Sequence, residues 1–466
     1  MHIYDTKQRK KVSFSPERDN TVRMYTCGPT IYNFAHIGNL RTFVFEDLLR
    51  RSIKFLGMGV FHVMNLTDVD DKTIAGAIKN NETLLEFTKP FEDAFHEDLK
   101  TLNVEKAEKY PKATEFIDQM VEMIEKLIKK GVAYNTSTGD VFFRIKSFPK
   151  YGELSHLHLE DLEIGRSARV DADEYDKESA TDFVLWKAYD PSRDGEIFWE
   201  SSLGRGRPGW HMECSCMSMH YLGDTFDLHT GGVDNIFPHH ENEIAQSEAL
   251  SGKTFSRHWM HSDHLLVEGK KMSKSLGNFY TLRDLLDKGY SGREVRALFL
   301  ASHYRTQLNF TFDGLLATRR SLSRLDTFVE RLTHNKTGEI IDVSSFEKDF
   351  KEAISDDLNT PKAFATLFDM IRFVNAKIDE KNVNTSQVLA FLHEVDKVLG
   401  FIFSEKDEVI ESFILDAALS RFKARAEKDY ARADLMRDVI EKAGYLVEDT
   451  KEKCLIKKKE NYANDK

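Results

Sequence analysis

The sequence predicts an α/β domain that is built on a parallel sheet and carries an inserted module, followed by an all-α helical bundle and a small C-terminal α+β module. A strand, helix, strand pattern in residues 21–66 predicts the sheet. Apolar residues at three- and four-residue steps beyond residue 312 predict the bundle. After residue 410 the chain has helical patterns of its own and an expected hairpin at residues 445–456.

The first parallel pair is predicted from local signals. A β-compatible run at residues 21–27 stops at Gly28-Pro29, through which no strand continues. Residues 38–56 show the apolar spacing of a helix, and residues 60–66 are expected to form a second strand. Because the crossover between the strands is long, we expect the two strands to be parallel.

Ligand binding is expected where these strands end, beside Cys27 and His36. Residues 34–39, Phe-Ala-His-Ile-Gly-Asn, open the first helix. The free N–H groups and the positive dipole end of a helix N-terminus attract anions, and a histidine there can donate to a phosphate oxygen. Taken alone, His36 is more simply interpreted as an ordinary exposed loop residue.

The middle of the chain supplies further sheet segments and an insertion. Residues 82–131 are expected to form one or two amphipathic helices, and the acidic stretch 141–190 is interpreted as part of an inserted module. Sheet segments resume at residues 226–232 and 259–267, the second of which leads into the basic loop 268–278.

The helical bundle is predicted from three apolar stripes, which lie in residues 315–332, 364–374 and 388–399. Thr360 and Pro361 are expected to be the N-cap and a first-turn residue of the second helix. The whole chain is thereby divided into six expected segments: 1–118, the first half of the sheet domain; 119–204, the inserted module; 205–262, the second half of the sheet domain; 263–312, the region of the basic loop; 313–403, the helical bundle; and 410–466, the C-terminal module.

Composition limits the classes of protein. Four cysteines in 466 residues cannot form a dense disulfide framework, so metal binding or reduced thiols are expected. The chain has no 18-residue apolar run and no secretory signal pattern, which predicts a soluble, cytoplasmic protein. The net charge of −11 argues on its face against a nucleic-acid partner.

The basic loop changes the interpretation of His36. Residues 270–278 read Lys-Lys-Met-Ser-Lys-Ser-Leu-Gly-Asn, a cationic segment suited to stabilising charge on a polyphosphate leaving group. Together with His-Ile-Gly-Asn at residues 36–39, it resembles the paired HIGH and KMSKS signatures of class I aminoacyl-tRNA synthetases, with Asn39 in place of the final histidine.

This resemblance implies a Rossmann-type catalytic domain that activates an amino acid with ATP and Mg²⁺ and then esterifies tRNA. The amino-acid carboxylate attacks the α-phosphorus, so positioning and charge stabilisation carry the rate. The resemblance implies catalytic roles for His36, Asn39, Lys271 and Lys274, and nucleotide contacts for His36, Gly38, Asn39, Asp234 and Lys274.

Residue types that bind metals recur in the sheet domain. An expected helix places His239 and Glu243 four apart on one face, while Cys214 precedes that helix and Cys27 ends the first strand. Two thiolates, an imidazole and a carboxylate form a plausible zinc shell. The residues alone leave two alternatives open, Cys216 in place of Cys214 and His240 in place of His239.

Residues 27–30, 209–215 and 237–246 resemble those of the cysteinyl-tRNA synthetase family, and the resemblance covers essentially the whole chain. Within that family the ligands of one Zn²⁺ per chain correspond to Cys27, Cys214, His239 and Glu243.

The family's zinc also binds the thiolate of the substrate L-cysteine. This distinguishes cysteine from serine, because a soft sulfur anion is a far better zinc ligand than an alcohol. The resemblance further implies that Thr67 and Trp210 line the cysteine pocket.

Charge is distributed so that RNA binding remains compatible with a net −11. Residues 266–326 contain 11 basic and 6 acidic residues, a local +5, and residues 421–466 contain 13 and 10, a local +3. These segments are where the acceptor end and the anticodon of tRNA(Cys) would lie. The resemblance implies tRNA contacts by Arg425, Asp429 and Tyr430, with Tyr430 able to stack on a base. We expect a monomer.

Two other functions are compatible with parts of the sequence. A ligase that transfers activated cysteine to a small amine would share the catalytic half, but it would not need the C-terminal module. A non-catalytic, zinc-stabilised RNA-binding protein would not need His36, Lys271 and Lys274.

Overall fold

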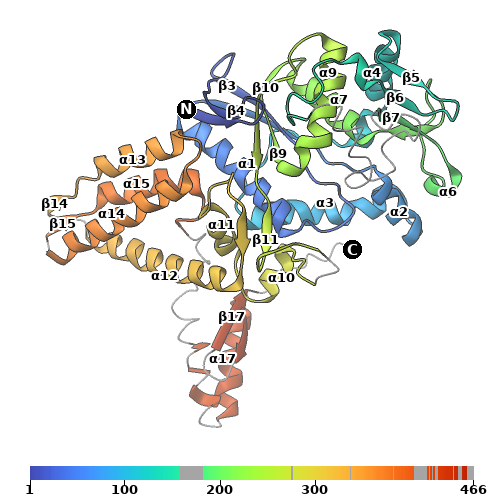
Figure 1. Cartoon of the computed structure of the whole chain (residues 1–466). Helices are drawn as coiled ribbons and strands as arrows, with labels where there is room; N and C mark the ends of the chain where they lie inside the picture. Colours follow the sequence, from blue (N-terminus) through green and yellow to red (C-terminus); the bar gives the residue numbers. More distant parts are fainter. Residues whose placement is uncertain are drawn as a thin grey trace. The chain divides into compact units, whose positions relative to one another are not determined.

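The structure is a computed structural model of the chain, in which two compact units comprise Met1–Ile402 and Phe403–Lys466 (Figure 1). The residues that it describes are 1–157, 182–273, 277–335, 337–380, 382–403, 417–418, 420–421, 423–425, 429–443, 445–449 and 454–458.

A four-stranded parallel sheet forms the centre of the first unit. Its strands are β3 (Thr21–Thr26), β4 (Gly59–Met64), β9 (Phe226–Gly232) and β10 (Ser256–Ser262). They lie in the order β10-β9-β3-β4, and each neighbouring pair is parallel. The chain moves from β3 to β4 on one side and later returns to β9 on the other, so the strand order reverses between β3 and β9. Ligands of open α/β sheets bind at the carboxyl ends of the strands at such a point.

Helix α1 (Ile37–Phe55) connects β3 to β4, which confirms the expected crossover. Its apolar residues Leu40, Val44 and Leu48 recur at four-residue steps and are buried, and the helix packs against β4 and β9. After the helix, Gly57 has a φ of 86°, a left-handed conformation that glycine adopts without steric cost.

The segment between β4 and β9 forms helices and a second sheet. The helices are α2 (Asp71–Asn80), α3 (Leu84–Thr101), η1 (Ala113–Phe116), α4 (Ile117–Lys129), η2 (Ile145–Ser147), α6 (Pro191–Asp194) and α7 (Trp210–Leu222). The sheet is antiparallel, in the order β5 (Ala133–Asn135), β6 (Val141–Phe143), β7 (Phe183–Ala188) and β8 (Gly206–Pro208). Strands β6 and β7 lie within the stretch 141–190 that the sequence assigns to the inserted module, of which residues 158–181 lie outside the described residues.

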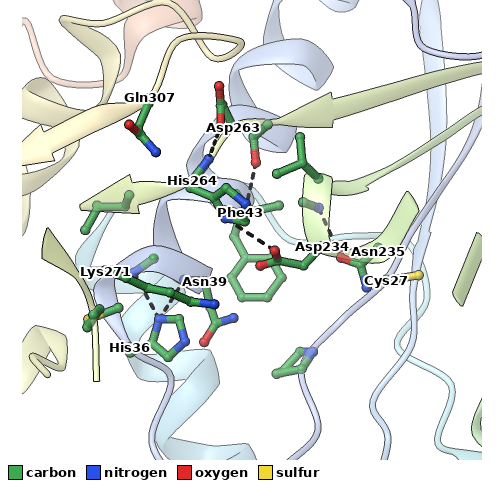
Figure 2. Close-up of a pocket in the computed structure, with 18 of the residues that line it drawn as sticks. Cys27, His36, Asn39, Phe43, Asp234, Asn235, Asp263, His264, Lys271 and Gln307 are labelled. Carbon is green, nitrogen blue, oxygen red and sulfur yellow. Dashed lines mark hydrogen bonds and ion pairs between the residues drawn. The ribbon is translucent and has the colours of Figure 1, made fainter. Parts of the chain in front are cut away.

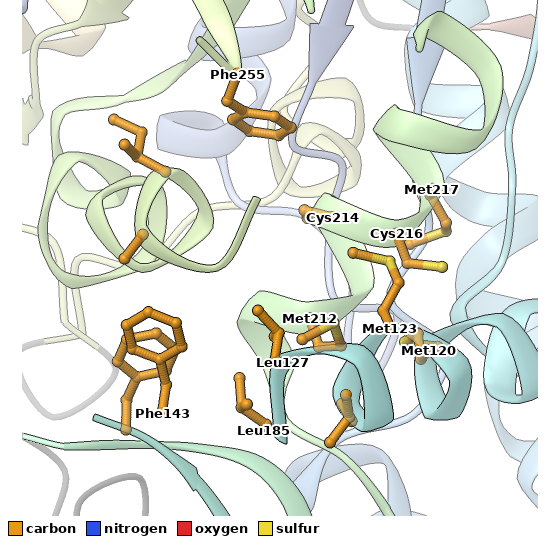
Figure 3. Close-up of a cluster of buried hydrophobic side chains, with 14 of the residues drawn as sticks. Met120, Met123, Leu127, Phe143, Leu185, Met212, Cys214, Cys216, Met217 and Phe255 are labelled. Atoms are coloured by element: carbon orange, nitrogen blue, oxygen red, sulfur yellow. The ribbon is translucent and has the colours of Figure 1, made fainter. Parts of the chain in front are cut away.

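One hydrophobic core joins this second sheet to the parallel sheet. Figure 3 shows members of it from α4, α7 and the antiparallel sheet, together with Phe255, which directly precedes β10: Met120, Met123, Leu127, Phe143, Leu185, Met212, Cys214, Cys216, Met217 and Phe255. Since α7 packs between these side chains and β3, the core fixes the helix that carries Cys214 beside the end of the parallel sheet.

The expectation of one strand at residues 259–267 is wrong, because two strands of different sheets occupy this stretch. β10 ends at Ser262, whereas β11 (Leu265–Val267) pairs with β12 (Lys270–Lys271) and β13 (Leu308–Phe310). Asp263 and His264 lie between β10 and β11. Their carbonyl groups accept hydrogen bonds from the guanidinium of Arg41. This contact across the fold ends the strand, and no local sequence signal predicts it.

The rest of the first unit is mainly helical. After β9 come α8 (Val233–Asn235), η3 (Ile236–His240) and α9 (Glu241–Ser251); after β12 come α10 (Leu282–Asp287), α11 (Gly292–Leu300), α12 (Phe312–His334), α13 (Ser344–Ser355), α14 (Thr360–Glu380) and α15 (Ser386–Leu399). Two short pairs complete it: β1 (His2–Asp5) with β2 (Lys10–Ser13), and β14 (Glu339–Ile340) with β15 (Val383–Asn384). The three apolar stripes correspond to α12, α14 and α15.

The expected N-cap of α14, Thr360, is wrong by one residue. The Asn359 side chain accepts a hydrogen bond from the Lys362 N–H at 3.1 Å, and its carbonyl accepts one from the Ala363 N–H at 3.0 Å. Asn359 is therefore the cap, and both residue types are favoured at this position.

In the second unit, helix α17 (Tyr430–Lys442) precedes an antiparallel pair, β16 (Tyr445–Asp449) and β17 (Cys454–Lys458). The hairpin expected at residues 445–456 is thereby confirmed. Ile440 of α17 is buried with Ala417 and Ala418 in a small core of this unit. Across both units, none of the helices in the described part of the chain is long and apolar enough to span a membrane.

Candidate active site

A cavity of about 470 Å³ lies at the carboxyl ends of β3 and β9, where the strand order reverses (Figure 2). The predicted site residues that line it are Cys27, His36, Gly38, Asn39, Trp210, Asp234 and Lys271. Residues that lie far apart in the sequence therefore meet in one cavity, as the parallel topology predicts.

His36 caps helix α1 and determines which donors the cavity offers. Its Nδ1 atom accepts hydrogen bonds from the N–H groups of Gly38 at 3.1 Å and Asn39 at 3.2 Å, while the Ile37 N–H donates to the Tyr280 carbonyl at 2.9 Å. The expectation of unpaired amides at this helix end is therefore wrong. Because Nδ1 accepts and burial lowers the pKa of His36, the neutral ring carries its proton on Nε2.

Gly38 allows this cap and a close approach of the basic loop. A Cβ atom at Gly38 would lie 3.0 Å from the His36 ring and 3.3 Å from the terminal methyl of Met272. Any larger residue at position 38 would displace the imidazole or the loop.

The basic loop brings Lys271 to the cavity. The Asn278 side chain closes the loop, because it accepts from the Ser273 N–H at 2.8 Å and donates to the Lys271 carbonyl at 3.1 Å. Lys274 lies outside the described residues.

The opposite wall of the cavity is polar. The Asp234 carboxylate lies 3.3 Å from Nδ1 of His264, and its side chain is 79% exposed. Asp263 and Gln307 also line this wall (Figure 2). The wall offers donors and acceptors to a polar ligand such as a nucleotide.

Four side chains meet at the other end of the cavity, beside Cys27. Cys27, Cys214, His239 and Glu243 each bring one potential ligand atom within 4.8 Å of the others. The Cys27 sulfur lies 3.9 Å from the Cys214 sulfur and 3.8 Å from the Glu243 carboxylate, which is 3.1 Å from Nε2 of His239. These separations are close to the edges, about 3.3–3.8 Å, of a tetrahedron whose centre lies about 2.0–2.3 Å from its corners, the bond lengths of zinc sites.

A second ligand set would share Cys27 and Glu243 but use His229 and His240. His229 lies 2.9 Å from Oε2 of Glu243, whereas Oε1 faces His239. A carboxylate that binds a metal is usually oriented by such a hydrogen bond to its other oxygen. The geometry therefore favours His239 as the ligand, with His229 orienting Glu243, while His240 hydrogen-bonds the Cys27 sulfur at 3.3 Å.

Burial makes this cluster suited to a cation. Burial raises the pKa of the Cys27 thiol and of the Glu243 carboxyl well above their usual values and lowers that of His239. Nδ1 of His239 hydrogen-bonds Nδ1 of His211 at 2.8 Å, whereas its buried Nε2, although 3.1 Å from Oε1 of Glu243, has no partner with hydrogen-bond geometry within the described residues. A divalent cation would satisfy that nitrogen and balance the thiolate and carboxylate charges. These residues fit a metal ion.

Trp210 connects the cluster with the cavity, but Thr67 does not. The Trp210 ring stacks on His239 with centroids 4.0 Å apart and lines the cavity. Thr67 is 1% exposed and donates to the Glu213 carboxylate at 3.0 Å, and its backbone pairs with Thr30, which lines the cavity instead. Thr67 thus lies beneath the cavity wall.

The three residues expected to contact tRNA belong to the second unit. The Asp429 side chain caps α17 by accepting from the Arg432 N–H at 3.1 Å. Tyr430 is 61% exposed, and Arg425 is exposed as well.

Sequence reasoning missed the supporting residues His211 and His229 and the wall residues Asp263, His264 and Gln307. One signal was available: eight of the 17 histidines lie in residues 211–264. Such a density of metal-binding side chains on one half of a sheet domain points to more than the ligands alone.

The fold is that of class I aminoacyl-tRNA synthetases. The family of class I (C) tRNA synthetase catalytic domains matches residues 13–320, and the DALR domain matches residues 349–404. The Mycobacterium tuberculosis methionyl-tRNA synthetase in complex with methionyl-adenylate shares the fold, with a TM-score of 0.59 and 11% identity over 82% of this chain and 88% of that chain. LeuRS of Agrobacterium radiobacter K84, in a ternary complex with tRNA and LeuAMS, also has a TM-score of 0.59, with 12% identity over 82% and 84%.

More similar relatives narrow the class to one family. Cysteine–tRNA ligase of Protochlamydia amoebophila (strain UWE25) is 52% identical over 467 residues, 98% of each chain. Cysteine–tRNA ligase of Chlamydia pneumoniae is 52% identical over 461 residues, 97% of each chain. The chain belongs to the cysteine–tRNA ligase family, whose activity is the ATP-dependent ligation of cysteine to its tRNA. Neither of the other two functions considered from the sequence is supported.

Proposed function

We propose that the cavity joins L-cysteine to ATP and passes the cysteinyl group to tRNA(Cys), with one Zn²⁺ held by Cys27, Cys214, His239 and Glu243. The observation that carries this proposal is that Cys27, a member of the buried cluster of potential metal ligands, lines one end of the cavity, and His36 with Lys271 lines the other. A substrate that spans it presents its side chain to the cluster and its carboxylate to the phosphates.

In the activation step the cysteine carboxylate attacks the α-phosphorus of ATP, which is bound with Mg²⁺, and pyrophosphate leaves. No protein nucleophile is needed, so the residues act by position and charge. The Nε2–H of His36, the Asn39 amide and the ammonium of Lys271 are donors for the phosphate oxygens, and Lys274 adds a second cation. The cysteinyl-adenylate then transfers its acyl group to the terminal ribose of the tRNA.

Selectivity for cysteine resides at the metal end. Zn²⁺ at this cluster would supply a soft Lewis acid that prefers a thiolate to the alcohol of serine. His211 orients His239 through the contact between their Nδ1 atoms. The Trp210 ring stacks on the face of the His239 ring and holds it in place. Because the discrimination is chemical, we expect no editing activity.

The expected tRNA contacts of the second unit belong to the same proposal. Tyr430, which is 61% exposed, is available for stacking on an anticodon base, and Arg425 is an exposed cation five residues before it in the sequence. Asp429 is engaged as the cap of α17, so its role is to place Tyr430 at the start of the helix. The six segment boundaries, a monomeric state and a cytoplasmic location stay predictions.

Amino-acid-dependent pyrophosphate exchange and charging of tRNA(Cys) test this proposal together. We expect one zinc per chain, exchange with cysteine but not with serine, and transfer to tRNA(Cys). Exchange with cysteine that is never followed by transfer would contradict the proposed acceptor. Equal exchange with serine, or full activity after removal of the metal, would contradict the proposed role of zinc.

A further inference from the structure

We propose that Asp357, in the loop between α13 and α14, and Arg41 of α1 are positioning residues for the nucleotide end of the cavity. They hold the segment 303–307, which ends at the cavity-lining residue Gln307. The inference rests on the proposed function, in which this end of the cavity binds ATP.

Asp357 is a buried hub that joins three parts of the chain. Its side chain is fully buried. Oδ1 accepts hydrogen bonds from the Tyr4 N–H at 2.8 Å and the Tyr304 hydroxyl at 2.6 Å, and Oδ2 accepts two from the Arg305 guanidinium at 2.8 and 2.6 Å. A buried carboxylate with four donors and a cationic partner is fixed in one orientation. Asp357 thus attaches the loop between α13 and α14 to segment 303–307.

The backbone of the same loop reinforces this attachment. The Asp357 carbonyl accepts from Nε2 of His303 at 2.9 Å, and its N–H donates to the His2 carbonyl at 2.9 Å. Asp357 and Leu358 have φ values of 60° and 53°, the left-handed region that non-glycine residues rarely adopt. Two consecutive residues keep such a conformation only where surrounding contacts determine it, and such sites concentrate where function requires a fixed geometry.

Arg41 holds the segment from the opposite side. Its buried guanidinium donates to the carbonyls of Asp263 and His264, each at 2.7 Å, and to those of Thr306 at 2.5 Å and His303 at 3.3 Å. All four acceptors belong to the two stretches that form the wall. A planar fork with several donors can hold two strands of backbone at once, which a lysine cannot do.

The two stretches also bind each other. The Asp263 N–H donates to the Tyr304 carbonyl at 2.8 Å, and the Leu308 N–H donates to the His264 carbonyl at 3.1 Å. The wall is therefore one unit, attached to α1 by Arg41 and to the helical bundle by Asp357. Since α1 also carries His36 at its N-terminus, these contacts set the distance between the phosphate donors and the far wall. A misplacement of about 1 Å in such a site can cost up to about 100-fold in rate.

The test compares Asp357→Asn with Asp356→Asn in the full-length, zinc-loaded protein. Asp356 is the next residue of the same loop, but its carboxylate is 53% exposed and pairs with Lys11 at 2.7 Å, away from the wall. In cysteine-dependent pyrophosphate exchange we expect Asp357→Asn to raise the KM for ATP about tenfold. The KM for cysteine and the zinc content should stay within twofold of wild type, and Asp356→Asn should change neither KM.

Tyr304→Phe is a milder second variant, which tests the same contact if Asp357→Asn does not fold. It removes one hydrogen bond to Asp357 and retains the stack of Tyr304 on Phe45, with centroids 4.4 Å apart. We expect a rise in the KM for ATP of about threefold.

Two results would overturn the inference. One is an unchanged KM for ATP, within experimental error of wild type, in the folded Tyr304→Phe protein and also in Asp357→Asn if that variant folds. The other is a parallel rise of both KM values with a lower melting temperature, which indicates a merely structural role. In both cases the wild type remains active, whereas a wild type without cysteine-dependent exchange would refute the proposed function itself.

Discussion

Nδ1 of His36 lies 3.2 Å from the backbone nitrogen of Asn39, and this hydrogen bond gives the histidine two separate roles. As an N-cap it satisfies amides that would otherwise lack a partner, which contributes about 1 kcal/mol to stability. Because the cap uses Nδ1 as an acceptor, the proton resides on Nε2, which the proposed function assigns as a donor to phosphate oxygens. The helix cap and the proposed phosphate contact thus use different nitrogens of one ring.

His36→Asn separates these two roles. Asparagine is a favoured N-cap residue but has no donor at the position of Nε2, so we expect the free energy of unfolding to stay within about 0.5 kcal/mol of wild type. The kcat of pyrophosphate exchange should fall by about 10²–10³, the usual loss of one transition-state donor. His36→Ala should lose the same activity and, in addition, about 1 kcal/mol of stability in denaturant unfolding. Full activity of folded His36→Asn would refute the donor role.

The two cysteines of α7 offer a matched pair of variants for the metal. Both are buried in the hydrophobic core, but only Cys214 lies near Cys27, at 3.9 Å, and burial raises the pKa of Cys216 to about 12. We expect Cys214→Ser to lose zinc and cysteine activation together, because serine is a poor zinc ligand. Cys216→Ser should keep both, with a small loss of stability. Metal analysis and pyrophosphate exchange decide between them, and the opposite pattern would show that the other sulfur is the ligand.

The spacing of the sequence did not decide which of these two cysteines is the expected metal ligand, and the reason is physical. Positions 214 and 216 are two apart on one helix, so their side chains point in nearly opposite directions, and both directions are buried. Which direction faces the metal depends on how α7 packs against β3, a contact between distant parts of the chain. Family resemblance supplied the assignment that the spacing alone could not.

The same distinction explains which parts of the fold were predictable. The pair β3 and β4 with α1 between them follows from local periodicity and from turn residues, and it was predicted to within a residue or two. The break at Asp263 and His264 was missed because its cause is Arg41, more than two hundred residues earlier. His229 was missed for a similar reason, since its role is defined by Glu243 on another element.

His211 contacts one of the proposed metal ligands without being one itself, so we expect its loss to weaken zinc binding rather than abolish it. Its Nδ1 contact with His239 at 2.8 Å fixes the ring whose Nε2 would bind the proposed metal. His211→Phe should lower zinc affinity by about 10–100-fold, the usual effect of removing such a partner. Competition with a chromogenic chelator measures this loss. His220→Phe, on the same helix against Phe116, is the control that should keep wild-type affinity.

The buried His62 predicts a pH dependence of stability that is separate from the metal. Its Nε2 lies 2.8 Å from the Thr26 hydroxyl, its Nδ1 has no hydrogen-bond partner within the described residues, and its side chain is almost fully buried. Burial, with a smaller contribution from the nearby positive charge of Arg50, lowers its pKa to about 3. The unfolded chain has a histidine pKa of about 6.5, so above that pH both states are neutral and His62 adds no pH dependence.

As the pH falls from about 6.5 toward 3, the unfolded chain takes up a proton that the folded protein excludes, and stability decreases by up to about 1.4 kcal/mol per pH unit. His62→Gln keeps an amide for the Thr26 hydroxyl but removes this titration. We therefore expect the free energy of unfolding of the wild type to fall more steeply than that of the variant between pH 6 and 4, by about 1 kcal/mol per pH unit. Other histidines and the metal ligands contribute equally to both proteins, so the difference between the two denaturant-unfolding curves isolates His62. Parallel curves over this range would contradict the lowered pKa.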